Sequence, residues 1–499
     1  MLYLGIDSGT QSTKTIVLDF ETGEILASSS AAYGLIQGLG PGHMEQDPQD
    51  WIAATEQSIE GCLAKIGDRR KEIKAIGVSG QQHGLVLLNR QGEPVRAAKL
   101  WCDTATQEQC EEIAAHFGGQ SELIAKTGNA MLPGYTASKI LWVKQHEPAN
   151  YAATETILLP HDYLNFWLSG EKRMEYGDAS GTALFDVRTR TWNREICEFI
   201  APDLLEKLPP LGSSAAPVGI LRNALAEKWG LSGEVLISAG GGDNMMGAIG
   251  TGNIRSGIVT ASLGTSGTLY AYSDKPIIDE EGEIAAFCDS TDAWMPLACT
   301  MNVTVATERV RQLFGWTHAE LEAAVASVPV GAKGLLFLPY LNGERMPSLP
   351  NGKGVFHGLT METMAAPFMA RATMEGVTMG LGYGMNRFRS LGVNPTEIRL
   401  TGGGSNSALW RQMCADVFGC STVALRTAEG AALGAAIQAA WTDHRVNQSS
   451  LSLADITARF VQLDETTRCQ PEKSAVEFYS KWQVRQTELM RRLHGSGYL

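Results

Sequence analysis

Two short stretches rich in glycine and hydroxyl residues constrain the fold of this 499-residue chain more than any other feature. The first, SGTQST at 8–13, separates the apolar runs LYLGI at 2–6 and TIVL at 15–18. The second, SLGTSG at 262–267, follows another apolar run at 257–261. Short β-branched runs joined by turn-forming residues are typical of β-hairpins. Their recurrence predicts an old duplication, with two α/β domains that each contribute one such hairpin.

The N-terminal region predicts a meander, a helix and a further strand in that order. The turn-forming sequence at 19–24 is followed by ILASSSA at 25–31, which we expect to form a third antiparallel strand. Asp47 is a candidate N-cap and Pro48 a candidate first residue of an amphipathic helix. The apolar run IKAIGVSG at 73–80 then predicts a buried strand that ends in polar residues.

In the second half of the chain, two predicted strands each end in a run of glycines. VLISAGGGDN at 235–244 runs into three glycines and an acid, and a later strand ends in LTGGG at Gly404. We expect an N-terminal domain at 1–245 and a C-terminal domain at 246–499. The sequence at 474–495 predicts an amphipathic helix that packs against the second domain.

Composition narrows the functional classes. The formal net charge of −13 argues against a nucleic-acid-binding surface, which would need a basic stripe. The nine cysteines include no C-x-x-C pair, which favours a reducing compartment, so we expect a cytoplasmic protein. The sequence has no apolar run of 18 residues, so we expect no membrane span.

The two hairpin tips are suited to binding phosphate. Backbone N–H groups and hydroxyls at a glycine-rich turn can converge on one anion. The sequence contains no G-x-x-x-x-G-K-[ST] motif and no G-x-G-x-x-G motif, so a nucleotide would have to be held by the paired hairpins. Asp7 would repel bound phosphates unless a cation such as Mg²⁺ lay between them. The alternative is that residues 8–13 are only a polar turn.

Asp243 in the segment GGGDN is a candidate general base. The preceding glycines, Gly240 to Gly242, leave room for close approach, and a carboxylate there could accept a proton from an attacking alcohol. The alternative is that Asp243 caps the helix that follows it.

Polar side chains after the strand at 73–80 form a third candidate site. Gln82 and His83 are suited to binding a polyhydroxylated molecule, although a lone histidine is more often structural. Trp101 and Asp103 offer an aromatic face beside an acid, which can hold a sugar or form a packed edge.

Taken together, these segments resemble the FGGY family of carbohydrate kinases, within the actin-like, ribonuclease H-like ATPases. DSGTQSTK and SLGTSG resemble the family's two phosphate motifs, and LTGGGSNSALWRQ resembles its adenosine motif. GYTASKILWVKQH at 134–146 is similar to the first family signature, and residues 354–375 are similar to the second. The resemblance implies two ribonuclease H-like domains with a catalytic cleft between them.

The resemblance also implies roles for individual residues. Asp243 would be the catalytic base, and Asp7 would position Mg²⁺ through water. The sugar would be bound by Gln82, His83, Asp103, Asp243 and Asn244. The phosphates of ATP would be held by Thr10, Gln11, Ser12, Thr13, Gly264, Thr265 and Ser266, and the adenine would be flanked by Gly403 and Ser407.

Several stretches are most similar to family members that act on D-xylulose, among them GQQHG at 80–84, LPHDYL at 159–164 and LPYLNGERMP at 338–347. The expected activity is therefore transfer of the γ-phosphoryl group of MgATP to D-xylulose. Family members are often dimers, so a homodimer is also implied. Two alternatives remain open at this point: a kinase for another ketopentose or polyol, such as ribulose or glycerol, and an actin-like ATPase scaffold without sugar chemistry.

Overall fold

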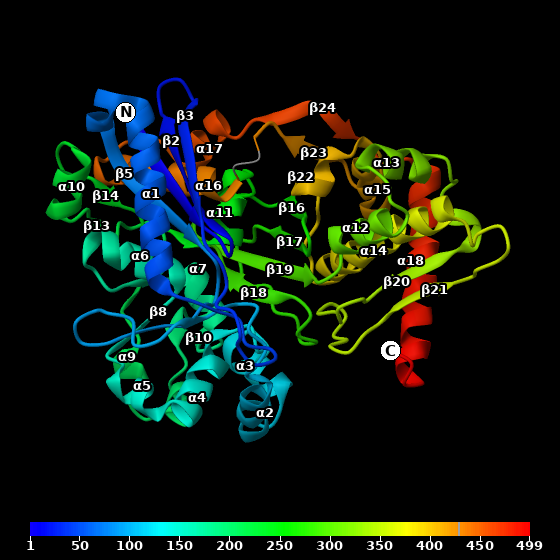
Figure 1. Ribbon diagram of the computed structural model, residues 1–499, viewed down its shortest axis with the longest axis horizontal. Helices are drawn as coiled ribbons and strands as arrows, with labels where there is room; N and C mark the ends of the chain where they lie inside the picture. Colours follow the sequence, from blue (N-terminus) through cyan, green and yellow to red (C-terminus); the bar gives the residue numbers. More distant parts are fainter. Residues whose placement is uncertain (428–429) are drawn as a thin grey trace. The chain divides into compact units, whose positions relative to one another are not determined.

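The computed structural model describes residues 1–427 and 430–499 and is a mixed α/β structure (Figure 1). The chain folds into two compact units, each assembled from three stretches of sequence. Unit 1 consists of Met1–Ile254, Tyr272–Pro296 and the described part of Glu429–Val461. Unit 2 consists of Arg255–Ala271, the described part of Leu297–Ala428, and Gln462–Leu499.

The sheet of unit 1 has seven strands in the order β13-β14-β5-β1-β2-β3, and β15 also pairs with β5. Its strands are β1 (Leu2–Ser8), β2 (Ser12–Asp19), β3 (Ile25–Ala32), β5 (Ile73–Gly80), β13 (Gly219–Ile220), β14 (Leu236–Ile237) and β15 (Gly241–Gly242). The β1-β2-β3 meander is antiparallel, whereas β5 runs parallel to β1. The predicted meander and the predicted strand at 73–80 are both confirmed.

The predicted N-terminal helix is α1 (Pro48–Ile66), and it begins as expected. The Asp47 side chain accepts a hydrogen bond from the Gln49 N–H at 2.9 Å, and Pro48 occupies the first turn, where its missing N–H costs nothing. Trp51 and Ile59 on the buried face of α1 belong to the core beneath β1 and β5. In Figure 1, α1 runs beside β2 and β3.

Most of the helices in the described residues lie in unit 1. They are α1, α2 (Gln107–His116), α3 (Gln120–Thr127), α4 (Thr136–His146), α5 (Pro148–Ala153), α6 (Pro160–Ser169), α7 (Tyr176–Ala179), α8 (Arg194–Ile200), α9 (Leu204–Lys207), α10 (Asn223–Trp229), α11 (Asp243–Gly250), α16 (Gly430–Val446) and α17 (Leu453–Phe460).

Helix α16 covers the other face of the unit 1 sheet and touches it through backbone atoms. A Cβ atom at Gly5 of β1 would lie 1.9 Å from the Ala432 carbonyl oxygen. A Cβ atom at Gly434 of α16 would lie 1.8 Å from the Met246 carbonyl oxygen of α11. Glycine is therefore required at both contacts, because real Cβ atoms do not approach other heavy atoms this closely. Helix α16 therefore packs closely against both β1 and α11.

The second seven-stranded sheet has the order β18-β19-β17-β16-β22-β23-β24. Its strands are β16 (Ile258–Leu263), β17 (Gly267–Ala271), β18 (Ala285–Cys288), β19 (Trp294–Thr300), β22 (Glu397–Thr401), β23 (Thr422–Leu425) and β24 (Leu463–Cys469). Strands β16 and β17 are antiparallel and form the predicted second hairpin. Strand β22 lies parallel to β16, as β5 lies parallel to β1 in unit 1.

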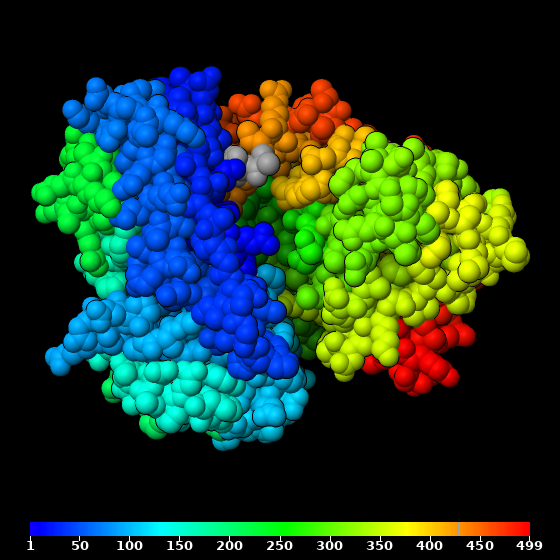
Figure 2. All heavy atoms as spheres, in the orientation of Figure 1, coloured from blue at the N-terminus to red at the C-terminus, as the bar shows by residue number. Residues whose placement is uncertain are grey.

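The helices of unit 2 include the predicted C-terminal helix, which is α18 (Lys473–Gly495). The others are α12 (Thr304–Leu313), α13 (His318–Ala326), α14 (Ala366–Ser390) and α15 (Ala408–Phe418). The Gln486 Nε2 of α18 donates to the Phe337 and Gly376 carbonyl oxygens at 3.1 and 3.2 Å, so α18 packs within unit 2 as predicted. Its last turns (red) lie at the surface in Figure 2. Among the described residues, no helix combines the length and apolarity that crossing a bilayer requires.

Candidate active site

The carboxyl ends of three parallel strands meet at one edge of the unit 1 sheet. In the register, β5 lies between β1 and β15, so that Ser79 stands opposite both Asp7 and Gly241. The Ser79 Oγ donates a hydrogen bond to the Asp7 Oδ1 at 2.9 Å. The residues that follow β5 and β15 in the sequence, Gln82 and Asp243, therefore emerge near Asp7.

Asp243 is the first residue of α11, and Gly242 occupies the N-cap position. The alternative that Asp243 is the N-cap of this helix is therefore wrong. Its Oδ1 accepts hydrogen bonds from the Asn244 backbone N–H at 2.8 Å and from the Asn244 Nδ2 at 3.0 Å. Burial, together with the negative charge of Asp7, raises the pKa of Asp243 to about 7. A carboxyl group with this pKa is suited to accept a proton near neutral pH.

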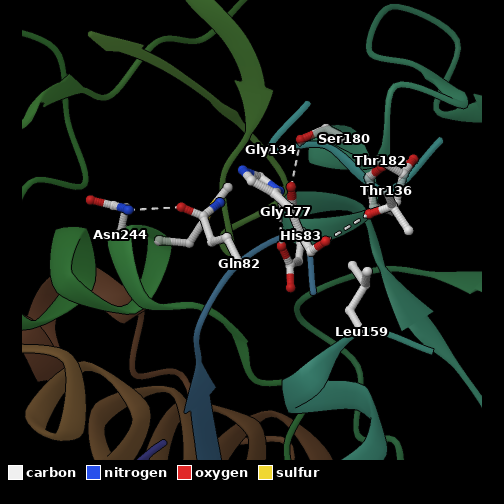
Figure 3. A network of polar contacts seen from close by, with 12 residues as sticks. Gln82, His83, Gly134, Thr136, Leu159, Gly177, Ser180, Thr182 and Asn244 are labelled. Atoms are coloured by element: carbon white, nitrogen blue, oxygen red, sulfur yellow. Dashed lines mark hydrogen bonds and ion pairs between the residues drawn. The ribbon is translucent and has the colours of Figure 1, made fainter. Parts of the chain in front are cut away.

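Asn244 connects Asp243 to Gln82. The Asn244 Nδ2 also donates to the Gln82 Oε1 at 2.7 Å, as Figure 3 shows. A Cβ atom at Gly242 would lie 2.5 Å from the Gln82 Cγ, so the glycine makes room for this side chain. Three of the predicted sugar-binding residues thus form one hydrogen-bonded row.

His83 lies next to this row in an unusual conformation. Its backbone φ is +60°, a left-handed value that is uncommon for residues other than glycine. The imidazole ring packs edge-on against Tyr135, with centroids 5.0 Å apart, and lies 5.4 Å from the Phe287 ring. A Cβ atom at Gly181 would lie 2.0 Å from the His83 Cε1, so a larger residue there would displace the ring.

Behind His83 lies a buried charged cluster that was not predicted from the sequence. The His161 side chain lies between Asp178 and Asp162, with nitrogen-to-oxygen distances of 3.0 Å on both sides. Burial opposes a charge on His161, but the two carboxylates raise its pKa well above the ordinary value. The Asp178 Oδ1 lies 3.8 Å from the His83 Nδ1. His161 belongs to the LPHDYL stretch, which was the only sequence signal for this cluster.

Asp103 is fully buried and is bonded to other parts of unit 1. Its Oδ2 accepts hydrogen bonds from the Met44 N–H and from the Lys99 Nζ, both at 3.0 Å. The Lys99 ammonium also contacts the Glu45 Oε1 at 3.1 Å, the His43 Nδ1 at 3.1 Å and the face of the Trp142 ring at 4.0 Å. A lysine thus occupies the centre of the one His–Glu–Asp group that has metal-ligand spacing among the described residues. Binding of sugar by Asp103 stays a prediction.

The predicted phosphate-binding residues of the first hairpin tip differ in their exposure to solvent. Gln11 is exposed and Ser12 is half-buried. The Thr10 Oγ1 accepts a hydrogen bond from the Trp101 Nε1 at 3.0 Å. Thr13 is fully buried, and its hydroxyl donates to the Ser8 Oγ at 3.1 Å. Thr13 therefore stabilises the hairpin from inside.

The second hairpin tip and the predicted adenine-binding residues lie in unit 2. The Thr304 N–H donates to the Gly264 carbonyl oxygen at 2.9 Å, and the Val303 N–H donates to the Thr265 carbonyl oxygen at 3.1 Å. The start of α12 thus fixes the tip, beside which Ser266 leads into β17. Binding of phosphate at either tip stays a prediction.

A cavity of about 520 Å³ in unit 2 brings Gly403 and Ser407 together. Its walls combine apolar side chains, such as Leu321 and Met374, with polar ones, such as Glu322. The Ser407 Oγ donates to the Glu322 Oε1 at 2.6 Å and accepts from the Trp410 N–H at the start of α15. Mixed walls of this kind suit a flat heterocycle with a polar edge.

Comparisons with known proteins agree with this arrangement. Residues 2–250 match the N-terminal domain model of the FGGY family of carbohydrate kinases, and residues 259–442 match its C-terminal domain model. The chain is 43% identical to a xylulose kinase of Haemophilus influenzae over 484 residues, covering 96% of this chain and 97% of the relative. It is 36% identical to a xylulose kinase of Escherichia coli, covering 87% and 89% of the two chains.

The fold agrees with a solved structure as well. A ligand-bound xylulose kinase from Lactobacillus acidophilus superposes with a TM-score of 0.92 at 26% identity and covers 99% of both chains. The predicted α/β class with two sheet-containing parts is confirmed. The chain belongs to the FGGY family of carbohydrate kinases.

Proposed function

We propose that this protein transfers the γ-phosphoryl group of ATP to the terminal hydroxyl of D-xylulose and produces D-xylulose 5-phosphate. One observation carries the proposal: Asp243, with a pKa near neutrality, is hydrogen-bonded through Asn244 to Gln82, beside His83, at a single sheet edge. Relatives named xylulose kinase that align along nearly the whole chain support this choice of sugar.

In this reaction the ionised Asp243 accepts the proton of the sugar hydroxyl as that oxygen attacks phosphorus. Phosphoryl transfer passes through a loose transition state, so a single positioned base and local charge stabilisation suffice. The Gln82 amide and the His83 ring supply donors and acceptors for the sugar's other hydroxyls. Asp7 supplies a carboxylate oxygen of the type that Mg²⁺ prefers, and bound Mg²⁺ would offset phosphate charge.

The proposal predicts a pH dependence with a defined sign. Because burial and Asp7 raise the pKa of Asp243 to about 7, kcat/KM for the sugar should fall as the pH drops below about 7. Initial rates between about pH 5 and pH 9 test this statement. In Asp7→Asn, titrated without ATP or Mg²⁺, the repulsion is absent, so the pKa of Asp243 should be lower than in the wild type. An unchanged pKa of Asp243 in that variant would contradict this electrostatic account.

The sugar assignment is tested by a substrate panel. Purified protein with MgATP is assayed for ADP release with D-xylulose, D-ribulose and glycerol, and without any sugar. We expect kcat/KM to be highest for D-xylulose. A higher value for ribulose or glycerol would keep the carbohydrate kinase and change its substrate, whereas no stimulation by any sugar would favour an ATPase scaffold.

A further inference from the structure

We propose that Lys139 is a positioning residue for sugar binding, because its buried ammonium group fixes the backbone turn that presents His83. The inference depends on the proposed function, in which His83 binds the sugar. It assigns a physical role to the lysine of the GYTASKILWVKQH segment.

The contacts of Lys139 are directed at the backbone of His83. Lys139 lies on α4 and is fully buried. Its Nζ donates to the His83 carbonyl oxygen at 2.8 Å and to the Gly134 carbonyl oxygen at 2.7 Å. The Thr136 Oγ1 donates to the same His83 oxygen at 3.2 Å, and Figure 3 shows Thr136 beside His83. Two side chains from the first turns of α4 thus hold a single carbonyl group.

The carbonyl group belongs to His83, whose backbone conformation is unfavourable unless its neighbours stabilise it. A φ of +60° is unfavourable for a side chain with a Cβ atom, and such a residue keeps this conformation only where its surroundings impose it. A hydrogen bond from a charged donor in a buried site is among the stronger ones. By fixing the peptide plane that follows His83, Lys139 and Thr136 also fix the direction of the His83 Cα–Cβ bond.

The surroundings of the ring make its position depend on this backbone geometry. Tyr135, which precedes α4, and Phe287 pack against the ring, and Gly181 leaves room only for a hydrogen atom beside it. The ring therefore cannot compensate for a rotated backbone without colliding with one of these neighbours. We expect a shift of the His83 carbonyl to move the imidazole nitrogens away from the sugar.

The charge of Lys139 distinguishes positioning from space filling. A buried ammonium group is costly unless it is hydrogen-bonded, whereas methionine fills a similar volume without that cost. If Lys139 only filled space, Lys139→Met would be nearly neutral. If it positions His83, the same change should impair sugar binding.

The experiment compares Lys139→Met with the wild type and with Lys144→Met. Lys144 lies on the same helix and also donates to a backbone carbonyl, that of Ile200 at 2.5 Å, so it controls for loss of a lysine from α4. In Lys139→Met we expect the KM for sugar to rise on the order of 100-fold, as for a small misplacement of a binding group. The KM for ATP and the sugar-independent ADP release should stay at wild-type values, and Lys144→Met should resemble the wild type throughout.

Two further variants keep the test decisive. Thr136→Val removes the weaker donor and should raise the sugar KM less than Lys139→Met does, which provides a reading even if Lys139→Met does not fold. In a His83→Ala background, neither change should raise the sugar KM further, because the group that they position is absent. An unchanged sugar KM in Thr136→Val and in folded Lys139→Met, or full effects in the His83→Ala background, would overturn the inference.

The outcomes also separate this inference from the proposed function. If the wild type prefers a sugar other than D-xylulose, the proposed substrate is wrong, and the Lys139 comparison is made with the preferred sugar. If the wild type phosphorylates D-xylulose and the Lys139 and Thr136 variants keep its KM, only the present inference fails. If no sugar is a substrate, both fail.

Discussion

Asp243→Asn should lower kcat for sugar phosphorylation by about 10²- to 10⁴-fold and change the KM for sugar far less. Asparagine has nearly the same shape as aspartate and can keep the contact with the Asn244 backbone N–H, but it cannot accept the proton of the attacking hydroxyl. Steady-state assays of ADP release with D-xylulose measure both constants. A kcat within a few-fold of the wild type would exclude Asp243 as the base.

The matched control is Asp416→Asn in unit 2. Its carboxylate also accepts a hydrogen bond from a backbone N–H, that of Glu472 at 2.8 Å, and burial also raises its pKa. We expect this variant to keep its kcat. If both variants lost activity equally, the loss in Asp243→Asn could not be assigned to proton transfer.

Stability measurements separate loss of the base from loss of folding. The pKa of Asp243 rises from 3.8 to about 7 on folding, so the folded state favours the protonated form. Protonated Asp243 therefore adds to the free energy of unfolding below about pH 4, and this contribution is lost as the pH rises through about 7. Asparagine does not ionise, so above pH 7 Asp243→Asn should be more stable than the wild type. A Tm of Asp243→Asn below that of the wild type at pH 8 would contradict this.

Gly434→Ala should destabilise the protein by about 3 kcal/mol or more, the upper range for overpacking. The added methyl group would lie 1.8 Å from the Met246 carbonyl oxygen and 2.9 Å from the Gly250 backbone nitrogen. Both atoms are backbone, so relief requires α11 and α16 to separate as whole helices. The change should therefore also lower kcat, because Asp243 is the first residue of α11. Urea unfolding and steady-state kinetics measure the two effects.

Gly430→Ala is the control for this change. Gly430 lies one turn earlier in α16, and a Cβ atom there would meet no described residue within 4 Å. Alanine also has the higher helix propensity, so Gly430→Ala should leave stability unchanged or raise it slightly. Equal losses in the two variants would show that the steric contact at Gly434 is not the cause.

Features of the fold that depend on neighbouring residues could be predicted from the sequence. The hairpins, the Asp47 cap and the C-terminal helix follow from local turn chemistry and periodicity, and all are confirmed. Gln82 and Asp243 were identifiable because each lies within two residues of the end of a strand. The glycines before Asp243 were expected to leave room for substrate, but the structure shows that Gly242 also makes room for the Gln82 side chain.

Features that depend on distant residues could not be predicted in this way. No local pattern joins His161 to Asp178, Lys139 to the His83 carbonyl, or the Lys99 ammonium to Glu45. The packing position of α16 could not be predicted either, because its alanine-rich sequence indicates a helix but not which sheet that helix covers. Only the three-dimensional arrangement shows that its small residues face Gly5 and Gly77 of the first sheet.

The position of α16 in the sequence has a consequence for synthesis on the ribosome. Strand β1, which carries Asp7, and strand β5, which precedes Gln82, are among the first parts of the chain to emerge, but the helix that covers one face of them is among the last. Until translation passes Val446, this apolar face of the nascent chain lacks its native cover and is open to chaperones or to misassembly. An N-terminal fragment expressed alone should therefore aggregate, and supplying 430–461 in trans should restore its solubility.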